Sequence, residues 1–231
     1  MELSEVTAIL LGTILGTAFR LQNRLCLHSS VIKIDDQAIA IIGEKGAGKS
    51  TTAAAFVKAG FPILADGVAV LNVDNFQSDV RFLVFPSYPK LRLWKSAMNG
   101  LFNHDHHSHD QVFQGLDKYF LDLSDNSQGV NNHHGSFYSQ PLALKAIYLL
   151  EQRQNQSSQI LPRLEKIPPH LALGKLMIHR YPQSLQVERN LQVQEFKKLG
   201  NLVKHIPVKT LHRKDDLQDL DQICDLIRED V

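Results

Sequence analysis

The stretch Gly43-Glu44-Lys45-Gly46-Ala47-Gly48-Lys49-Ser50 fits the P-loop pattern G-x-x-x-x-G-K-[ST] at every position. The run before it, Ala38–Ile42, is apolar and rich in β-branched residues, which predicts a buried strand. The run after it, Thr51–Ala59, predicts a helix that stops at Gly60. A strand, a glycine-rich loop and a helix in this order form the context in which the pattern makes a phosphate site.

The chemistry of this loop follows from its backbone and from a few side chains. Backbone N–H groups and the positive end of the helix dipole point toward one place and favour an anion there. The loop glycines let the backbone approach phosphate without a Cβ in the way. We expect Lys49 to reach the β- and γ-phosphates and the Ser50 hydroxyl to ligate Mg²⁺. Residues 43–50, together with Thr51, are therefore predicted to bind ATP with Mg²⁺.

Length and composition are those of an ordinary globular protein. The 231 residues suit a single domain, 43% of them are hydrophobic and 21% are charged. A formal net charge of +1 argues against a nucleic-acid partner that binds a broad basic face. Cys26 and Cys224 lie far apart in apolar settings, as reduced core residues of a cytoplasmic protein do.

The segment Val6–Phe19 is apolar but is too short to span a bilayer. Glu2 and Glu5 precede it where a signal peptide would carry basic residues. We expect it to be a buried N-terminal element, and we expect no membrane partner.

Two further strands are predicted close to the P-loop. Leu25–Ile34 reads as a strand, and the turn at Asp35-Asp36 makes it a hairpin with the P-loop strand. Ile63–Asp66 is a short apolar strand with an acid at its carboxyl end, where P-loop proteins place a metal-linked or catalytic carboxylate. The fold class is therefore α/β: a mixed sheet that carries the P-loop, with helices packed on it.

The C-terminal part of the chain continues this pattern. Its predicted elements are a core strand over Ala143–Glu151, helices over His170–Tyr181 and Leu185–Leu202, a strand over His205–Leu211, and a last helix capped by Asp215 or Asp216.

The order of these motifs is selective. His28 in a Leu-His-Ser-Ser strand, the P-loop, the strand ending at Asp66 and the block Tyr88–Trp94 resemble the catalytic core of HPr kinase/phosphorylase. The shorter HPr-kinase-like serine kinases, which lack that enzyme's N-terminal domain, match more closely. Pro141–Leu150 and the chain from Ile206 to Ile227 extend the resemblance over most of the sequence, and it implies the HPr kinase/phosphoenolpyruvate carboxykinase-like fold.

The resemblance implies transfer of the γ-phosphate of ATP to a serine of a peptide or small protein. Lys49 would neutralise the phosphate, Asp66 would take the acceptor's proton or help to hold Mg²⁺, and His28 would orient Asp66. On sequence alone, His28 reads as a hydrogen-bonded core histidine. Lys90 and Arg92 are candidates for phosphate or substrate contact, although Arg92 equally suits a structural ion pair.

The chain departs from these relatives at two features. Gly67 stands where they carry a second acid, which predicts a slow enzyme. The second glycine-rich signature of the full HPr kinase/phosphorylase is missing, so the reverse phosphorylase reaction is not expected. A catalytically weak or inactive nucleotide-binding regulatory protein is the alternative, and a homo-oligomer is left open.

A polar stretch from Asn103 to His134 stands apart. It holds His104, Asp105, His106, His107, His109, Asp110, His133 and His134, which suit a transition-metal site in a metal-sensing protein. Its composition favours a flexible insertion of about 103–134 instead, because no H-x-x-x-H frame fixes the ligands.

Overall fold

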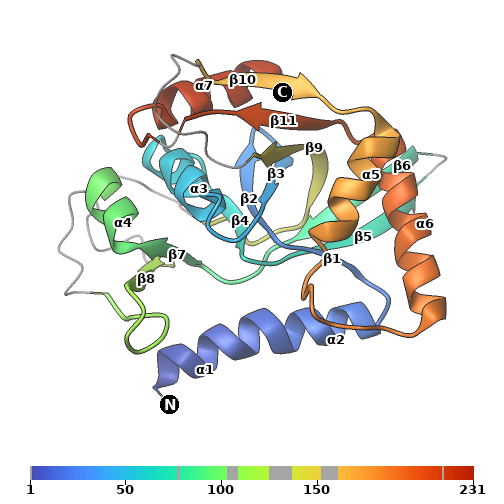
Figure 1. Ribbon diagram of the computed structural model, residues 1–231, viewed down its shortest axis with the longest axis horizontal. Helices are drawn as coiled ribbons and strands as arrows, with labels where there is room; N and C mark the ends of the chain where they lie inside the picture. The colour runs from blue at the N-terminus through green and yellow to red at the C-terminus, as the bar shows by residue number, and fades with distance from the viewer. Residues whose placement is uncertain (1, 77–78, 103–108, 125–136, 152–160, 215) are drawn as a thin grey trace.

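Figure 1 shows the computed structural model, which describes residues 2–76, 79–102, 109–124, 137–151, 161–214 and 216–231. The strands are β1 (Leu25–Leu27), β2 (Ser29–Ile34), β3 (Gln37–Gly43), β4 (Ile63–Asp66), β5 (Ala69–Phe76), β6 (Asp79–Phe85), β7 (Lys90–Trp94), β8 (Lys118–Asp122), β9 (Leu142–Leu150), β10 (Arg163–Lys166) and β11 (Val208–His212). The helices are α1 (Leu3–Ile9), the π-helix η1 (Leu10–Ile14), α2 (Leu15–Leu21), α3 (Lys49–Lys58), α4 (Lys95–Phe102), α5 (Pro169–Ile178), α6 (Arg189–His205) and α7 (Leu220–Asp230).

The main sheet is mixed and is built around β3. Its order is β1-β5-β6-β9-β3-β2-β4, and β11 and β10 extend it from β9. β3 runs parallel to β9 and antiparallel to β2, which in turn runs antiparallel to β4. The carboxyl ends of β3 and β4 therefore lie at one edge, where the P-loop and Asp66 meet. The predicted α/β class is confirmed.

Alternation along β3 divides the core between the two faces of the sheet, because successive side chains of a strand point to opposite sides. Ile39 and Ile41 belong to the cluster covered by α3, α4 and α7, whereas Ala38, Ala40 and Ile42 belong to the cluster covered by α5 and α6 (Figure 1). The strand is buried on both faces, as its continuous apolar run predicts.

A second, two-stranded sheet is formed by β7 and β8. β8 lies inside the range 103–134 that was expected to be one flexible insertion. That prediction is wrong for Lys118–Asp122, because Tyr119 and Leu121 are buried in the core and the backbone pairs with β7. Residues 103–108 and 125–136 lie outside the described part of the chain.

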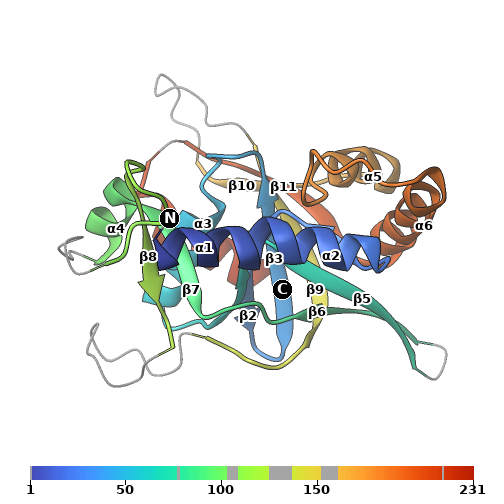
Figure 2. The same cartoon turned by 90° about the horizontal axis from the view of Figure 1, so that it is seen from below.

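The N-terminal helix, defined as α1, η1 and α2 together (Leu3–Leu21), crosses the molecule beside the main sheet (Figure 2). Burial was predicted for the segment Val6–Phe19, yet Val6, Leu10 and Ile14 are 43%, 44% and 51% exposed. The error arises because an apolar run does not show how much of its circumference is covered. The helix is also longer than the predicted segment: at 19 residues it is long and apolar enough to cross a membrane by length and composition alone.

The C-terminal elements follow the predictions with shifted ends. α5 ends at Ile178 because the chain then pairs with β1, through the bridge between Arg180 and Leu27. α6 begins at Arg189 and not at Leu185. The last helix begins at Leu220 with Asp219 at its N-cap position, so neither predicted cap is correct; Asp215 is outside the described residues, and Asp216 accepts a hydrogen bond from Gln218 N.

Candidate active site

The P-loop joins β3 to α3 at the carboxyl edge of the sheet. Gly46 and Gly48 have φ angles of 85° and 97°, in the left-handed region that glycine adopts without strain. Gly48 is the N-cap of α3, and no side chain caps the helix, so its first N–H groups are left for an anion. Ala47 is buried, and its carbonyl accepts a hydrogen bond from the buried Arg213.

Lys49 is buried at the start of α3 with only 6% of its surface exposed. Its Nζ donates to the carbonyl oxygens of Gly43 and Glu44, at 3.0 Å each. Burial lowers the pKa of Lys49 to about 8, against the opposing effect of the nearby Asp66 carboxylate. A second negative group at this position would stabilise the charged amine, and phosphate is such a group.

Asp66 is the centre of the hydrogen-bond network. It is 1% exposed, and its Oδ1 accepts from Ser30 Oγ at 2.6 Å and from Ser50 Oγ at 2.8 Å. Its Oδ2 accepts from the backbone N–H of Arg92 at 3.0 Å. The predicted metal pair, Ser50 and Asp66, is thus in direct contact. Two hard oxygen ligands side by side next to a phosphate site fit a Mg²⁺ ion that keeps several waters.

His28 lies in the same pocket as Asp66 but is not hydrogen-bonded to it in the described structure. Its ring lies against Tyr181, with centroids 5.5 Å apart. Burial, reinforced by Lys49, lowers the pKa of His28 to about 3, so the imidazole is neutral at physiological pH. Ser30, two residues further along, holds Asp66 in the way that was expected of His28.

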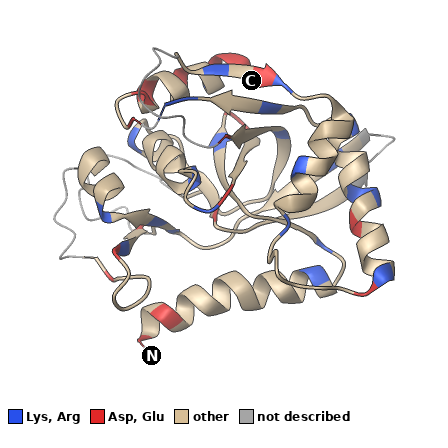
Figure 3. Cartoon of the chain, viewed as in Figure 1, with Lys and Arg blue, Asp and Glu red and all other residues tan. Residues whose placement is uncertain are grey.

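The β7–β8 pair supplies a second set of cations. Trp94 pairs with Lys118 and Arg92 pairs with Phe120, so Arg92 and Lys118 project from the same face of the ribbon. Lys118 lies over the Trp94 ring, and among the described residues it has no carboxylate partner. Burial lowers its pKa. Figure 3 shows basic residues on both this ribbon and the start of α3.

Arg92 and Lys90 have different places. Arg92 Nε donates to the Tyr88 hydroxyl at 2.6 Å, and its buried Nη2 has no hydrogen-bond partner in the described structure. Lys90 is paired with Asp122 at 3.2 Å and does not line the pocket. Of the two candidates for phosphate contact, only Arg92 is in position.

The pocket gathers most of the predicted site residues. Its lining is His28, Lys45, Gly46, Gly48, Lys49, Ser50, Thr51, Asp66, Gly67, Arg92, Trp94 and Lys118. Four cationic side chains face one carboxylate, and this balance fits a polyphosphate. Gly43, Glu44 and Ala47 support the loop through their backbones and do not line the pocket.

No protein-family model matches the chain, and no curated protein matches it. Among solved structures, it is similar to the HPr(Ser) kinase/phosphatase from Coxiella burnetii. Sequence identity is 11%, the TM-score is 0.46, and 89% of each chain is covered.

The backbone conformation at residue 67 accounts for a glycine, and not a second acid, after Asp66. The φ of Gly67 is +88°, and a Cβ built there would lie 3.7 Å from Arg92 Nη2. A left-handed backbone disfavours any other residue at this position. The Arg92 guanidinium therefore occupies the space beside Gly67.

The metal-sensor hypothesis rests mainly on residues outside the described structure. His109 and Asp110 are described, and the described parts of the chain hold no cluster of three or more His, Cys, Asp or Glu side chains arranged for a metal ion. The other six residues of that set lie outside these parts.

Three residues of the site were not predicted: Ser30, Lys118 and Arg213. Ser30 is the direct sheet partner of Asp66, and its place beside the apolar run Val31-Ile32 was its only sign in the sequence. Lys118 and Arg213 come from distant parts of the chain and follow no local pattern.

Proposed function

We propose that this chain is an ATP-dependent kinase that phosphorylates a hydroxyl, most simply the serine of a peptide or small protein. The observation that carries the proposal is the contact between Ser50 and Asp66 at the mouth of the P-loop, with cations on both sides. Phosphoryl transfer requires mainly positioning and charge stabilisation, and this arrangement offers both.

The cationic side chains of the pocket would contact the phosphates from two sides. Lys49 and the free N–H groups of α3 would hold the β- and γ-phosphates from the P-loop side. Arg92 and Lys118 would face the transferring phosphoryl group from the β7–β8 side, where charge develops in the transition state. The unpartnered Nη2 of Arg92 supports this role, since a buried donor without an acceptor is costly unless a ligand supplies one.

Asp66 and Ser50 would hold Mg²⁺, which neutralises the phosphate oxygens when bound. Asp66 also lies next to where an acceptor hydroxyl would approach the γ-phosphate. As the acceptor oxygen bonds to phosphorus and the bond to the departing ADP breaks, Asp66 takes the hydroxyl proton. Ser30 keeps the carboxylate oriented, and the neutral His28 adds no further positive charge beside it.

The same proposal places the protein in the cytoplasm, where ATP and reduced thiols are available. Cys26 and Cys224 are both free and buried, which fits a compartment where disulfides are rare. We propose neither nucleic acid nor membrane as a partner.

Tryptophan fluorescence and ADP formation test the proposal together. Trp94 is the chain's single tryptophan and lines the pocket, so ATP with Mg²⁺ should change its emission. With a pool of serine peptides, ADP should form in the wild type and in Asp122→Asn, an exposed control on β8, but not in Asp66→Asn. Equal ADP formation by all three proteins would overturn the role of Asp66.

One observation favours the regulatory alternative. Both carboxylate oxygens of Asp66 already accept hydrogen bonds, from Ser30, Ser50 and the backbone N–H of Arg92, and this leaves fewer free lone pairs for the proton of an acceptor hydroxyl. Under that alternative ATP changes the Trp94 emission and no peptide raises ADP formation.

A further inference from the structure

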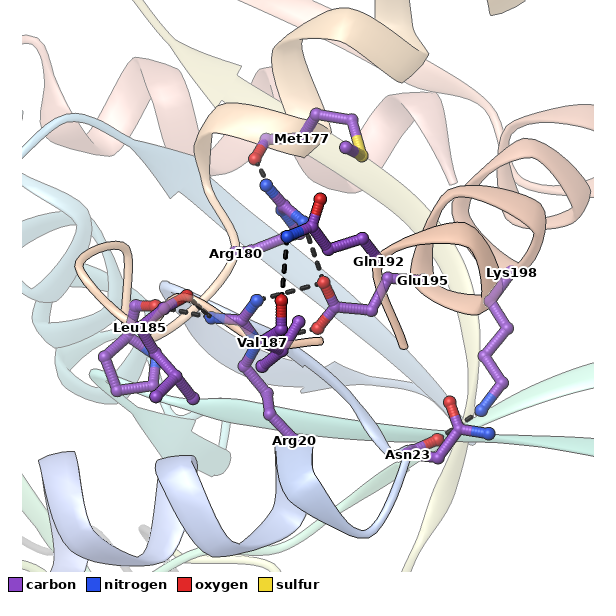
Figure 4. A network of polar contacts seen from close by, with 10 residues as sticks. Arg20, Asn23, Met177, Arg180, Leu185, Val187, Gln192, Glu195 and Lys198 are labelled. Atoms are coloured by element: carbon purple, nitrogen blue, oxygen red, sulfur yellow. Dashed lines mark hydrogen bonds and ion pairs between the residues drawn. The ribbon is translucent and has the colours of Figure 1, made fainter. Parts of the chain in front are cut away.

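The N-terminal helix is fixed firmly against the protein. At its C-terminal end Arg20 makes a buried two-pronged ion pair with Glu195, with contacts of 2.7 and 2.9 Å (Figure 4). Arg180 joins the same carboxylate at 2.7 Å, and Arg20 Nη1 donates to the Pro182 carbonyl at 2.6 Å. At the other end Glu5 accepts a hydrogen bond from Gln114 N at 3.0 Å. A helix held at both ends forms a fixed wall.

The middle of this wall reaches the candidate active site. A Cβ on Gly12 would lie 3.3 Å from the Tyr181 hydroxyl and 3.5 Å from Arg92 Nη2. A Cβ on Gly16 would come within 2.8 Å of the Tyr181 ring, which leaves no room for a side chain there. Gly12 lets the helix approach Arg92, which lines the phosphate pocket, and Gly16 lets it approach Tyr181, whose ring lies against His28 of that pocket.

A groove of about 330 Å³ lies between this helix and the main sheet. Leu11, Leu15 and Phe19 form the helix side, and Val68, Val70 and Phe85 form the sheet side. A mostly apolar groove with few polar groups, at the low end of the size range of ligand sites, is typical of a binding site.

The groove lies next to the phosphate pocket. Val68 lines the groove and directly follows Gly67, which lines the pocket. Tyr88 lines the groove, and its hydroxyl accepts the hydrogen bond of Arg92, which lines the pocket. A molecule with its hydroxyl at Asp66 would extend past Gly67 and the Tyr88–Arg92 pair to reach the groove.

The groove ends at a cation. From Leu11 to Phe19 the helix rises about 12 Å, the length of roughly three to four extended residues. Arg24 lines the groove beyond the end of α2, and within the described residues it has no carboxylate partner. An occupant that leads away from Asp66 would thus meet apolar walls first and a positive charge last.

We propose that this groove binds the acceptor peptide. Moving away from the reactive serine in one chain direction, this peptide has two apolar residues and then an acidic residue. The proposal rests on the kinase function proposed above and adds the substrate class. The apolar residues lie between the helix and the sheet, and the acid pairs with Arg24 at the end away from the phosphates.

Binding of labelled synthetic peptides tests the groove independently of phosphoryl transfer. The probes carry Ser-Leu-Leu-Asp, Ser-Gln-Gln-Asp or Ser-Leu-Leu-Lys, each in both chain directions, and bind to the protein in the presence of ADP and Mg²⁺. We expect the Leu-Leu-Asp peptide, in one direction, to bind at least roughly tenfold more tightly than the Gln-Gln peptide. Equal binding of all the peptides would overturn the proposal, as would binding of a dansylated fatty acid where no peptide binds.

Two neighbouring helix residues give a matched pair of variants. Leu15 lines the groove and Ile14 does not, although both side chains are exposed, at 36% and 51%. Leu15→Gln should weaken binding of the Leu-Leu-Asp peptide roughly tenfold, and Ile14→Gln should change it less than twofold. Equal effects of the two variants would contradict the groove. ATP binding, followed by Trp94 emission, should be unchanged in both.

Charge reversal gives a second test that does not depend on Leu15→Gln folding. Arg24→Glu should reverse the preference, so that the Leu-Leu-Lys peptide binds more tightly than the Leu-Leu-Asp peptide. An unchanged preference would remove Arg24 from the proposal. If peptides bind in this pattern but accept no phosphate, the proposed peptide groove is supported and the proposed kinase activity is refuted. If phosphate is transferred equally well whatever the flanking residues are, the kinase activity is supported and the peptide groove is refuted.

Discussion

Replacing Lys49 by Met should change how the stability of the protein depends on pH. The pKa of Lys49 falls from 10.5 to about 8 on folding, mainly because the amine is buried. Below pH 8 the folded protein therefore holds a charge that would be more stable in the unfolded chain. Between pH 8 and pH 10.5 the unfolded chain binds more protons, so stability rises with pH. A shift of this size corresponds to about 3 kcal/mol.

Urea denaturation at a series of pH values from 7 to 10 measures this effect. The free energy of unfolding of wild type minus that of Lys49→Met should rise by about 2–3 kcal/mol over the range. Lys49→Met also loses the two hydrogen bonds to Gly43 and Glu44. This loss changes the difference in unfolding free energy by a nearly constant amount at every pH and does not change its slope against pH. With saturating ATP the slope should shrink, because phosphate keeps the amine charged. If this free-energy difference does not change with pH in the absence of ATP, the claim that burial lowers the pKa of Lys49 is refuted.

Three further predictions concern the surroundings of the site. Lys118→Ala should lower the rate of transfer by about 10²-fold with little change in ATP affinity, as judged by Trp94 emission, whereas Lys90→Ala on the same ribbon should leave both unchanged. Gly67→Asp should destabilise the protein by about 1–2 kcal/mol in denaturation and should not raise the rate, since its carboxylate would pair with Arg92. Glu195→Ala should cost about 3–5 kcal/mol of stability, because it leaves the buried charge of Arg20 without its carboxylate partner; a loss below 1 kcal/mol would contradict this.

Local patterns were enough to predict the centre of the fold. The P-loop, the strand before it and the helix after it are contiguous in the sequence, and each has its own periodicity or turn residue. The acid at the end of β4 was predicted for the same reason, because a short apolar run ending in Asp66 can be recognised without knowing which strand it pairs with.

The remaining parts depend on contacts between distant segments. Lys118 enters the pocket only because β8 pairs with β7, inside a stretch whose composition predicts a loop. Ser30 orients Asp66 because of the register between β2 and β4, which no single run of sequence encodes. The exposure of the N-terminal helix depends on how much of its circumference the protein covers, and an apolar run is equally consistent with a fully buried helix.

The central claim is that the γ-phosphate of ATP passes to a hydroxyl held beside Asp66. Mass spectrometry of serine peptides after incubation with ATP and Mg²⁺ measures this directly. Phosphoserine should appear with the wild-type protein and be absent with Asp66→Asn, although both proteins bind ATP. Tight ATP binding by the wild type without phosphorylation of any peptide would contradict the claim and leave a nucleotide-binding regulatory protein.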